Sequence, residues 1–185
     1  MLGLIAAAGG CGSSTDAGDA TDPEARLAEA QRVMHQVGAT SALAMINDIV
    51  HDHPDFVEAH LFKGRLHHEL EKFDEALVAA EWAVKLDPDS GTAHLDRAIY
   101  LRELGREEEA FEALDRTQEC AMKVIEVNAF DVDAKLDLVM IAHLRGNSQS
   151  ALDQINLIVA DRPHSNKAKT LKRFLEGKVV EAAVH

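Results

Sequence analysis

The sequence is poor in aromatic residues and in cysteine, and each shortage excludes a class of structure. Aromatic side chains make up 4% of the 185 residues, so a hydrophobic core must be built mainly from Leu, Ile, Val and Ala. The two cysteines, Cys11 and Cys120, are too few and too far apart for a disulfide framework or a metal knuckle. Because Ala and Leu are abundant and β-branched runs are few, the composition favours helices over a sheet.

Basic residues are also scarce, since 19 Lys and Arg stand against 32 Asp and Glu, for a formal net charge of -13. Nucleic acid is bound largely by neutralising phosphates with Lys and Arg, so no nucleic-acid partner is expected. Adsorption to anionic lipid through charge alone is disfavoured for the same reason. Residues 1–10 are uncharged and apolar, but a run of this length cannot cross a bilayer, which needs about 20 residues.

The N-terminal segment 1–22 differs in composition from the rest of the chain. Five of the eleven glycines fall within the first eighteen positions, so this segment cannot bury enough apolar surface to order itself. Its apolar run ends in Ala8-Gly9-Gly10-Cys11, which resembles the end of a bacterial lipoprotein signal peptide. The resemblance implies a signal and lipidation segment over residues 1–11, with the lipid on Cys11, and a flexible tether over residues 12–22.

Such a protein would be held on the periplasmic side of a bacterial membrane, with a lipid anchor at Cys11 as its only membrane contact. Two features depart from the lipoprotein pattern. Ala8 stands where a large aliphatic residue is usual, and no basic residue precedes Arg26. The alternative is a plain disordered tail on a cytoplasmic protein.

Regularly spaced alanines and prolines reveal an internal repeat. The spacing from Pro54 to Pro88 is 34, and the alanines that share this register are Ala42, Ala76, Ala110 and Ala151, with spacings of 34, 34 and 41. A small residue, Gly64, precedes Ala76, and together they let two helices approach closely. A period of 34 with two helices in each unit resembles the tetratricopeptide repeat family.

The repeat divides the chain into consecutive units and a terminal helix. The units are 23–56, 57–90, 91–131 and 132–165, and a capping helix spans 166–182. The predicted fold class is all-α, a right-handed α-solenoid of antiparallel helix pairs similar to tetratricopeptide repeats, closed by the C-terminal capping helix. The third unit carries seven extra residues in its second helix, nearly two turns, so a helix of about 20 residues is expected there.

Several local signals mark where the helices begin and end. Gly105 and Gly146 stand where a helix must end in a left-handed residue. The candidate N-terminal caps are Asp55, Asp89 or Ser90, Asp131 and Ser165. The second helix of the third unit is expected to pack through Ala110, Leu114, Thr117, Ala121, Val124 and Ile125, and the capping helix through Leu171, Phe174, Leu175 and Val179.

In the tetratricopeptide family the first helix of each unit lines a concave surface that holds a peptide or a partner helix. The positions that would line it here share an i, i+4, i+7, i+8 spacing. They are Leu61, Arg65, His68 and Glu69, then Leu95, Ile99, Arg102 and Glu103, then Leu136, Met140, His143 and Leu144. An apolar floor with a few positive donors suits an amphipathic or acidic-hydrophobic segment.

Two alternatives bear on this surface. The aliphatic side chains could instead fill the inside of a tight superhelix, with Arg65 and Arg102 paired to Glu69 and Glu103. The family's best-known groove clamps a C-terminal carboxylate through Lys and Asn. Leu61, Arg65, Leu95 and Ile99 stand at those places here, so no such clamp is predicted.

Ten histidines raise the possibility of a metal site. His51 and His53 flank Asp52 in a predicted turn, whereas His67 and His68 point to different sides of a helix and cannot easily share an ion. The remaining candidates, His60, His67 and His94, fall at packing positions of the repeat, and Trp82 is expected to face outward and lie against its neighbours. We therefore predict no metal and no cofactor.

No sequence feature indicates catalysis. The chain has no glycine-rich phosphate loop, no nucleophile elbow and no HExxH motif. The sequence thus predicts a non-enzymatic scaffold that binds a protein or peptide partner, tethered to the membrane as an envelope assembly factor. The alternatives are a soluble cytoplasmic adaptor of the same family and an accessory or metal-binding protein that uses its histidines.

Overall fold

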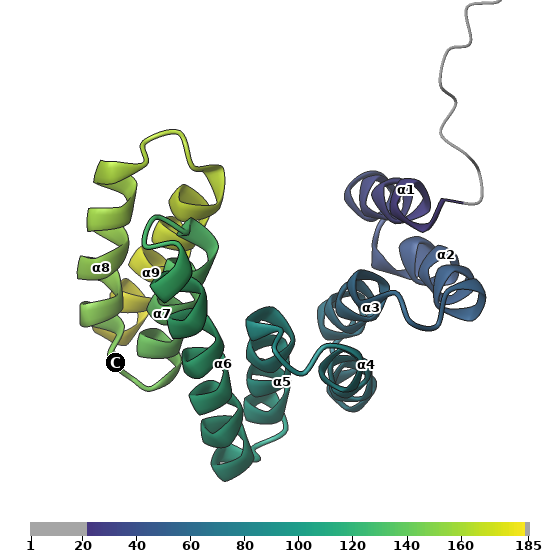
Figure 1. The fold of residues 1–185 in the computed structure, drawn as a ribbon, viewed down its shortest axis with the longest axis horizontal. Helices are drawn as coiled ribbons and strands as arrows, with labels where there is room; N and C mark the ends of the chain where they lie inside the picture. The colour runs from purple at the N-terminus through teal and green to yellow at the C-terminus, as the bar shows by residue number, and fades with distance from the viewer. Residues whose placement is uncertain (1–21, 184–185) are drawn as a thin grey trace, which may run out of the picture.

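The computed structural model describes residues 22–183, and within that range the chain forms nine α-helices and no strands (Figure 1). The helices are α1 Pro23–Gln36, α2 Ala39–Asp52, α3 Val57–Glu69, α4 Phe73–Leu86, α5 Gly91–Glu103, α6 Glu107–Val127, α7 Val132–Leu144, α8 Ser148–Asp161 and α9 Asn166–Ala183. The all-α solenoid expected from the repeat is confirmed. The predicted signal and lipidation segment 1–11 and nearly all of the tether 12–22 lie outside the described residues.

The helices follow a curved path, with α1 and α2 at one end and α8 and α9 at the other (Figure 1). Each helix packs against the next along the chain. The first helices of successive units also contact one another, α3 with α5, α5 with α7 and α7 with α9. Successive units come closest on the inside of a curve, so these contacts place α3, α5 and α7 on the concave side.

Small residues set how closely the helices cross. The repeated alanines Ala42, Ala76, Ala110 and Ala151 are all buried. A Cβ atom at Gly64 would lie 3.3 Å from the Ala76 carbonyl oxygen and 3.2 Å from the Tyr100 ring. A side chain at position 64 would therefore push α3 away from both α4 and α5, which explains why the repeat has a small residue there.

The turns inside the units use left-handed residues. Gly105 and Gly146 have φ of 72° and 85°, as their positions predict. The equivalent place in the unit 57–90 is Glu71, which has φ of 57°. A residue with a Cβ atom costs roughly 1–2 kcal/mol in this conformation, so this turn is less stable than its two counterparts.

Three of the predicted caps form. The Ser90, Asp131 and Ser165 side chains accept hydrogen bonds from the backbone N–H groups of Ala93, Ala134 and Ala168. Asp55 is not a cap, because α3 begins one residue later than that role requires. The residue at the N-terminal cap position of α3 is Phe56, which has no side-chain oxygen to accept a hydrogen bond.

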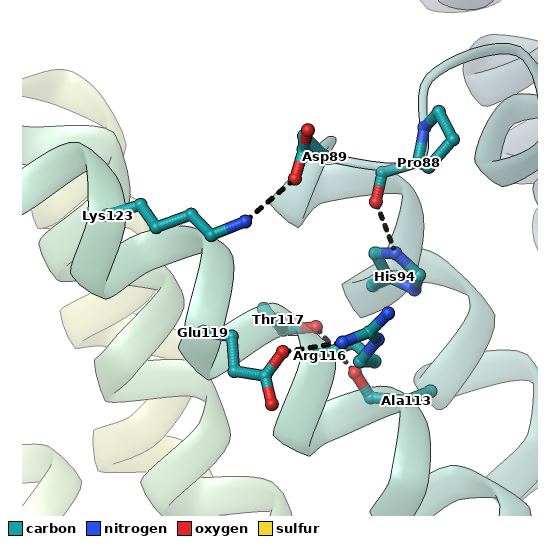
Figure 2. A network of polar contacts seen from close by, with 8 residues as sticks. All are labelled: Pro88, Asp89, His94, Ala113, Arg116, Thr117, Glu119 and Lys123. Carbon is teal, nitrogen blue, oxygen red and sulfur yellow. Dashed lines mark hydrogen bonds and ion pairs between the residues drawn. The ribbon is translucent and has the colours of Figure 1, made fainter.

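The long second helix of the third unit, α6, has 21 residues, as expected. Figure 2 shows two of its contacts: within the helix the Thr117 hydroxyl donates to the Ala113 carbonyl, and the Lys123 ammonium lies 2.9 Å from the Asp89 carboxylate in the loop between α4 and α5. The expected apolar stripe stops short, however, since Val124 is 44% exposed. Val127, the last residue of α6, is 91% exposed as well.

The capping helix α9 closes the last repeat through Ala168 and Leu175, both fully buried against α7 and α8. The expectation that Phe174 also closes this core is wrong, because its side chain is 44% exposed. Phe174 instead meets the edge of the His143 ring at 5.5 Å between ring centres. One residue of the cap is therefore turned toward the helices of the concave side.

Candidate peptide-binding surface

The predicted concave residues line two separate hollows. The first, here called the histidine hollow, has a volume of about 560 Å³ and is lined by His68, Ile99, Arg102, Glu103, Glu107, Met140, His143, Leu144, Phe174 and Lys178. The second, the aspartate hollow, has a volume of about 420 Å³ and is lined by Leu27, Gln31, Glu58, Leu61, Phe62, Arg65, Thr92, Asp133, Leu136, Asp137 and Lys167.

The structure brings most of the predicted residues together, but in two groups. The histidine hollow holds His68, Ile99, Arg102, Glu103, Met140, His143 and Leu144. The aspartate hollow holds Leu61, Arg65 and Leu136. Two residues line neither hollow: Glu69 is exposed at the end of α3, and Leu95 is buried in the core with Ala98 and Leu101.

The histidine hollow combines apolar side chains with polar nitrogens that lack a hydrogen-bond partner. The Nε2 atom of His68 and the Nε atom of Arg102 are buried and make no hydrogen bond within the described chain. Their closest acidic neighbours, Glu103 and Glu107, lie at ion-pair distances of 3.9 Å and 3.6 Å. Because unsatisfied buried donors are costly, an acceptor brought in by a partner would be favoured here.

His143 forms another wall of the histidine hollow. Its Nδ1 atom lies 3.0 Å from the Ser148 hydroxyl oxygen. Burial lowers the pKa of His143, and the nearby positive charges of Arg102 and Lys178 lower it further. The ring is therefore neutral at pH 7 and presents a weakly polar surface beside Phe174.

The aspartate hollow is lined by carboxylates, among them Asp133 and Asp137, that were not predicted from the sequence, and its arginine pairs with a further carboxylate. The Arg65 guanidinium donates through Nε to the Asp96 carboxylate at 3.0 Å. Burial raises the pKa of Asp96, and the Arg65 charge opposes that rise. Two further residues of the lining also pair, since the Lys167 ammonium is 2.7 Å from the Asp133 carboxylate.

Asp137 is a half-buried carboxylate of the same region. Burial raises its pKa to about 7, and the negative charges of Asp133, Asp96 and Asp131 add to that rise. The sequence alone could have shown that Asp137 is the repeat equivalent of Asp96, because the spacing from Asp96 to Asp137 equals that from Ala110 to Ala151.

The expected pairing of the arginines with Glu69 and Glu103 is not found, since Arg65 pairs with Asp96 and Arg102 with Glu107.

A third hollow, of about 530 Å³, lies between α2, α3 and α4 and was not predicted. The His60 ring stacks on Trp82 with 6.1 Å between ring centres, and its Nε2–H donates to the Pro54 carbonyl. Trp82 is half-exposed and carries the Lys85 ammonium over its ring at 4.4 Å. The outward position expected for Trp82, against its neighbours, is confirmed.

The histidines expected at packing positions are buried: His60, His67 and His94. His94 repeats the His60 arrangement one unit later, with its Nε2–H donating to the Pro88 carbonyl at 3.0 Å (Figure 2). Within residues 22–183, no three His, Cys, Asp or Glu side chains stand close enough together to hold a metal ion. Over the same range, no helix combines the length and the apolar character that crossing a bilayer requires.

The paired helices, their left-handed turns and their small crossing residues define a helical repeat protein of the solenoid class. The sequence matches the family model described as tetratricopeptide repeat over residues 27–80 and again over 69–124. Together the matches cover residues 27–124, which is more than half of the chain. The chain belongs to the tetratricopeptide repeat family, whose fold is typically a non-enzymatic protein-interaction module.

Solved structures share this fold at low sequence identity. TTC0263, a thermophilic tetratricopeptide protein of Thermus thermophilus, matches with a TM-score of 0.61 and 16% identity, over 83% of this chain and 81% of that one. The first repeat domain of Spaghetti (RPAP3), bound to the HSP90 peptide SRMEEVD, matches with a TM-score of 0.54 and 18% identity, over 71% of this chain and 94% of that one.

A chain of the CopN-Scc3 complex matches with a TM-score of 0.52 and 19% identity, over 56% of this chain. This protein spans 61% of that chain's length. Comparison with curated protein sequences finds no match. At these identities the structural matches establish the common fold alone.

Proposed function

We propose that this protein is a protein-interaction scaffold that holds an extended or helical segment of a partner along its concave face. The observation that carries the proposal is the histidine hollow. There the buried nitrogens of His68 and Arg102 that lack a hydrogen-bond partner adjoin the apolar side chains of Ile99, Met140 and Phe174. The Spaghetti repeat domain supports it, because that domain has the same fold and is bound to a peptide.

The chemistry of the histidine hollow suits a segment that pairs an apolar side chain with an acidic one. Ile99, Met140, Leu144 and Phe174 would pack against the apolar side chain. The Arg102 guanidinium would donate to the acidic side chain in a charge-assisted hydrogen bond. The acceptor would also satisfy a nitrogen that is otherwise buried without a hydrogen bond.

The test compares two charge-altering double variants for binding to a library of random displayed peptides. Arg102→Glu/Phe174→Asp changes two partly exposed residues of the histidine hollow. The matched control is Arg116→Glu/Phe111→Asp on α6, where Phe111 is 47% exposed and neither residue lines a described hollow. We avoid Arg65 because its removal would leave Asp96 buried without a countercharge.

Peptides selected on the wild-type protein should bind the control variant with unchanged affinity and the hollow variant at least about tenfold more weakly, since a charge-assisted hydrogen bond and its apolar contacts are lost. Equal binding to both variants would remove the histidine hollow from the proposal. Thermal melting of both variants serves as the check that each is folded.

We further propose that a lipid on Cys11 tethers the scaffold to the periplasmic side of a bacterial membrane, where it helps to assemble an envelope complex. The support is the Ala8-Gly9-Gly10-Cys11 sequence, which lies outside the described residues. Growing cells fed a tagged fatty acid should label the wild-type protein and leave Cys11→Ser unlabelled. Label on the Cys11→Ser variant, or none on the wild type, would favour the soluble adaptor instead.

A further inference from the structure

Two aspartates occupy equivalent places on neighbouring concave helices. The spacing from Asp96 on α5 to Asp137 on α7 is the same as that between the repeat markers Ala110 and Ala151. The unit 57–90 has Phe62 at this place, which is buried as an ordinary core residue. A carboxylate at a position suited to an apolar side chain requires a partner, because an isolated buried charge is costly.

Asp96 has such a partner and Asp137 does not. The Arg65 guanidinium, on the preceding concave helix α3, donates to the Asp96 carboxylate at 3.0 Å. One unit later, the position that corresponds to Arg65 is Ile99 on α5. It stands in the same relation to Asp137 as Arg65 does to Asp96, but it carries no charge. Among residues 22–183, no Lys or Arg forms an ion pair with Asp137.

The surroundings of Asp137 leave room for a cation, although the Lys167 ammonium, which pairs with Asp133, lowers the pKa of Asp137 without forming an ion pair with it. Its carboxylate lines the aspartate hollow beside Leu61 and Leu136. A Cβ atom at Gly91 would lie 3.3 Å from the Asp137 Oδ2 atom, so the glycine makes space for the carboxylate. The two cations that line the hollow, Arg65 and Lys167, are already engaged by Asp96 and Asp133.

We infer that the aspartate hollow takes a lysine or arginine side chain of the partner segment, with its aliphatic stem against Leu61 and Leu136 and its charge at Asp137. This inference rests on the proposed function, because it concerns the same concave face. It also predicts the orientation of the bound segment. Its basic side chain would lie in the aspartate hollow, and its acidic and apolar side chains would lie in the histidine hollow.

Binding of a cation in the aspartate hollow is coupled to loss of a proton from the Asp137 carboxyl. The charged groups that face Asp137 are Glu58 and Arg65 on α3, Asp96 on α5, Asp131 and Asp133 at the start of α7, and Lys167 on α9. Because Asp137 is half-buried and most of these groups are acidic, its pKa is raised to about 7, although the Lys167 charge opposes the rise. A bound cation favours the ionised carboxylate, so affinity for the cation should rise between about pH 6 and pH 8.

The test uses single amino-acid probes rather than an unidentified partner. N-acetylargininamide carries the guanidinium, and N-acetylcitrullinamide has nearly the same shape without the charge. Binding is followed through the methyl NMR signals of Leu61 and Leu136 in the full chain. The variants are Asp137→Asn and, as the matched control, Asp153→Asn at an exposed place on α8.

The argininamide should shift both methyl signals and bind more tightly at pH 8 than at pH 6, whereas the citrullinamide should leave them unchanged. Asp137→Asn should weaken argininamide binding about tenfold, since a charge-assisted hydrogen bond is lost, and should abolish its pH dependence. Asp153→Asn should bind as the wild type does. Equal binding of the two probes, or undiminished binding to Asp137→Asn, would overturn the inference.

Failure here and failure of the proposed function are distinguishable. If displayed peptides bind through the histidine hollow while argininamide does not bind, the cation inference alone is wrong. If no displayed peptide distinguishes Arg102→Glu/Phe174→Asp from its control, the histidine hollow is excluded whatever the probes do. Asp137→Asn is expected to fold, because it removes a negative charge from a half-buried place among other acidic groups, and its thermal melt checks this.

Discussion

Asp137 shows how one residue makes the stability of the fold depend on pH. Its carboxyl has a pKa of about 7 in the folded chain, against an ordinary value of 3.8. Between these values the folded state binds the proton more tightly than the unfolded state does. The contribution of this group therefore favours folding at low pH and is lost as the pH rises toward 7 and beyond.

Replacing Asp137 with Asn should consequently raise the melting temperature more at pH 8 than at pH 5, because the variant carries no negative charge at this half-buried place beside other acidic groups. Thermal melts of wild type and Asp137→Asn at both values measure the difference. Asp153→Asn, on the exposed side of α8, should show no such pH trend. A lower melting temperature for Asp137→Asn at pH 8 would mean that the carboxylate is stabilised by its surroundings.

Glu71 provides a second prediction at the level of a single residue. It occupies the left-handed turn position that Gly105 and Gly146 occupy in later units. Glu71→Gly should stabilise the protein by about 0.5–1 kcal/mol, since it relieves the left-handed strain at some cost in unfolded-state entropy. Gly105→Ala should destabilise it by about 1 kcal/mol. Urea unfolding measures the unfolding free energy of both variants. If the two substitutions changed it with the same sign, position 71 would not be a left-handed turn position equivalent to position 105.

The residues that the sequence identified well are those with a local cause. A glycine after a helix or a serine before one acts within a few residues, so Gly105, Gly146 and Ser90 could be placed from the sequence. Asp96 and Asp137 could not, because their role depends on which side chain the neighbouring unit brings opposite them. The repeat spacing alone shows that they are equivalent, and only the packing shows that one is paired.

At the level of helices, the capping helix α9 offers the sharpest contrast. Leu175 is fully buried against the last repeat, while its chain neighbour Phe174 is 44% exposed. The sequence predicted both to close the core. It could not separate them, because adjacent apolar residues on a helix differ by about 100° and the packing angle of α9 decides which one faces α7 and α8.

This contrast yields a prediction for α9. Leu175→Ala should cost about 2–5 kcal/mol in unfolding free energy, the usual range for a fully buried leucine. Phe174→Ala should cost well under half of that, because much of its ring remains in contact with solvent. Chemical denaturation of both variants provides the comparison. Similar losses for the two would show that Phe174, rather than Leu175 alone, closes the last repeat.

The long helix α6 illustrates what an insertion does to a repeat. Its length was predictable, because nearly two turns of helix return the chain to almost the same face. The exposure of Val124 was not, since it depends on how far the neighbouring helices reach. The Lys123–Asp89 ion pair joins the C-terminal part of α6 to the loop between α4 and α5, a surface contact expected to contribute less than about 1 kcal/mol (Figure 2).

At the scale of the whole molecule, the curved stack of helices presents a concave face with two different ends. The histidine hollow has apolar walls and buried nitrogens without hydrogen bonds, whereas the aspartate hollow has a half-buried carboxylate, Asp137, that forms no ion pair within the described residues. The sequence predicted which helices carry this face. It could not predict the division in two, which follows from the Arg65–Asp96 pair and from the packing of Leu95 into the core.

The central claim is that a partner segment lies along the concave helices α3, α5 and α7. Site-specific photo-crosslinking tests it most directly, with a photoreactive amino acid placed at Met140 on the concave side or at Phe111 on α6. A peptide selected on the wild-type protein should crosslink from Met140 and not from Phe111. Crosslinks from Phe111 alone would contradict the claim and place the partner on the outer helices.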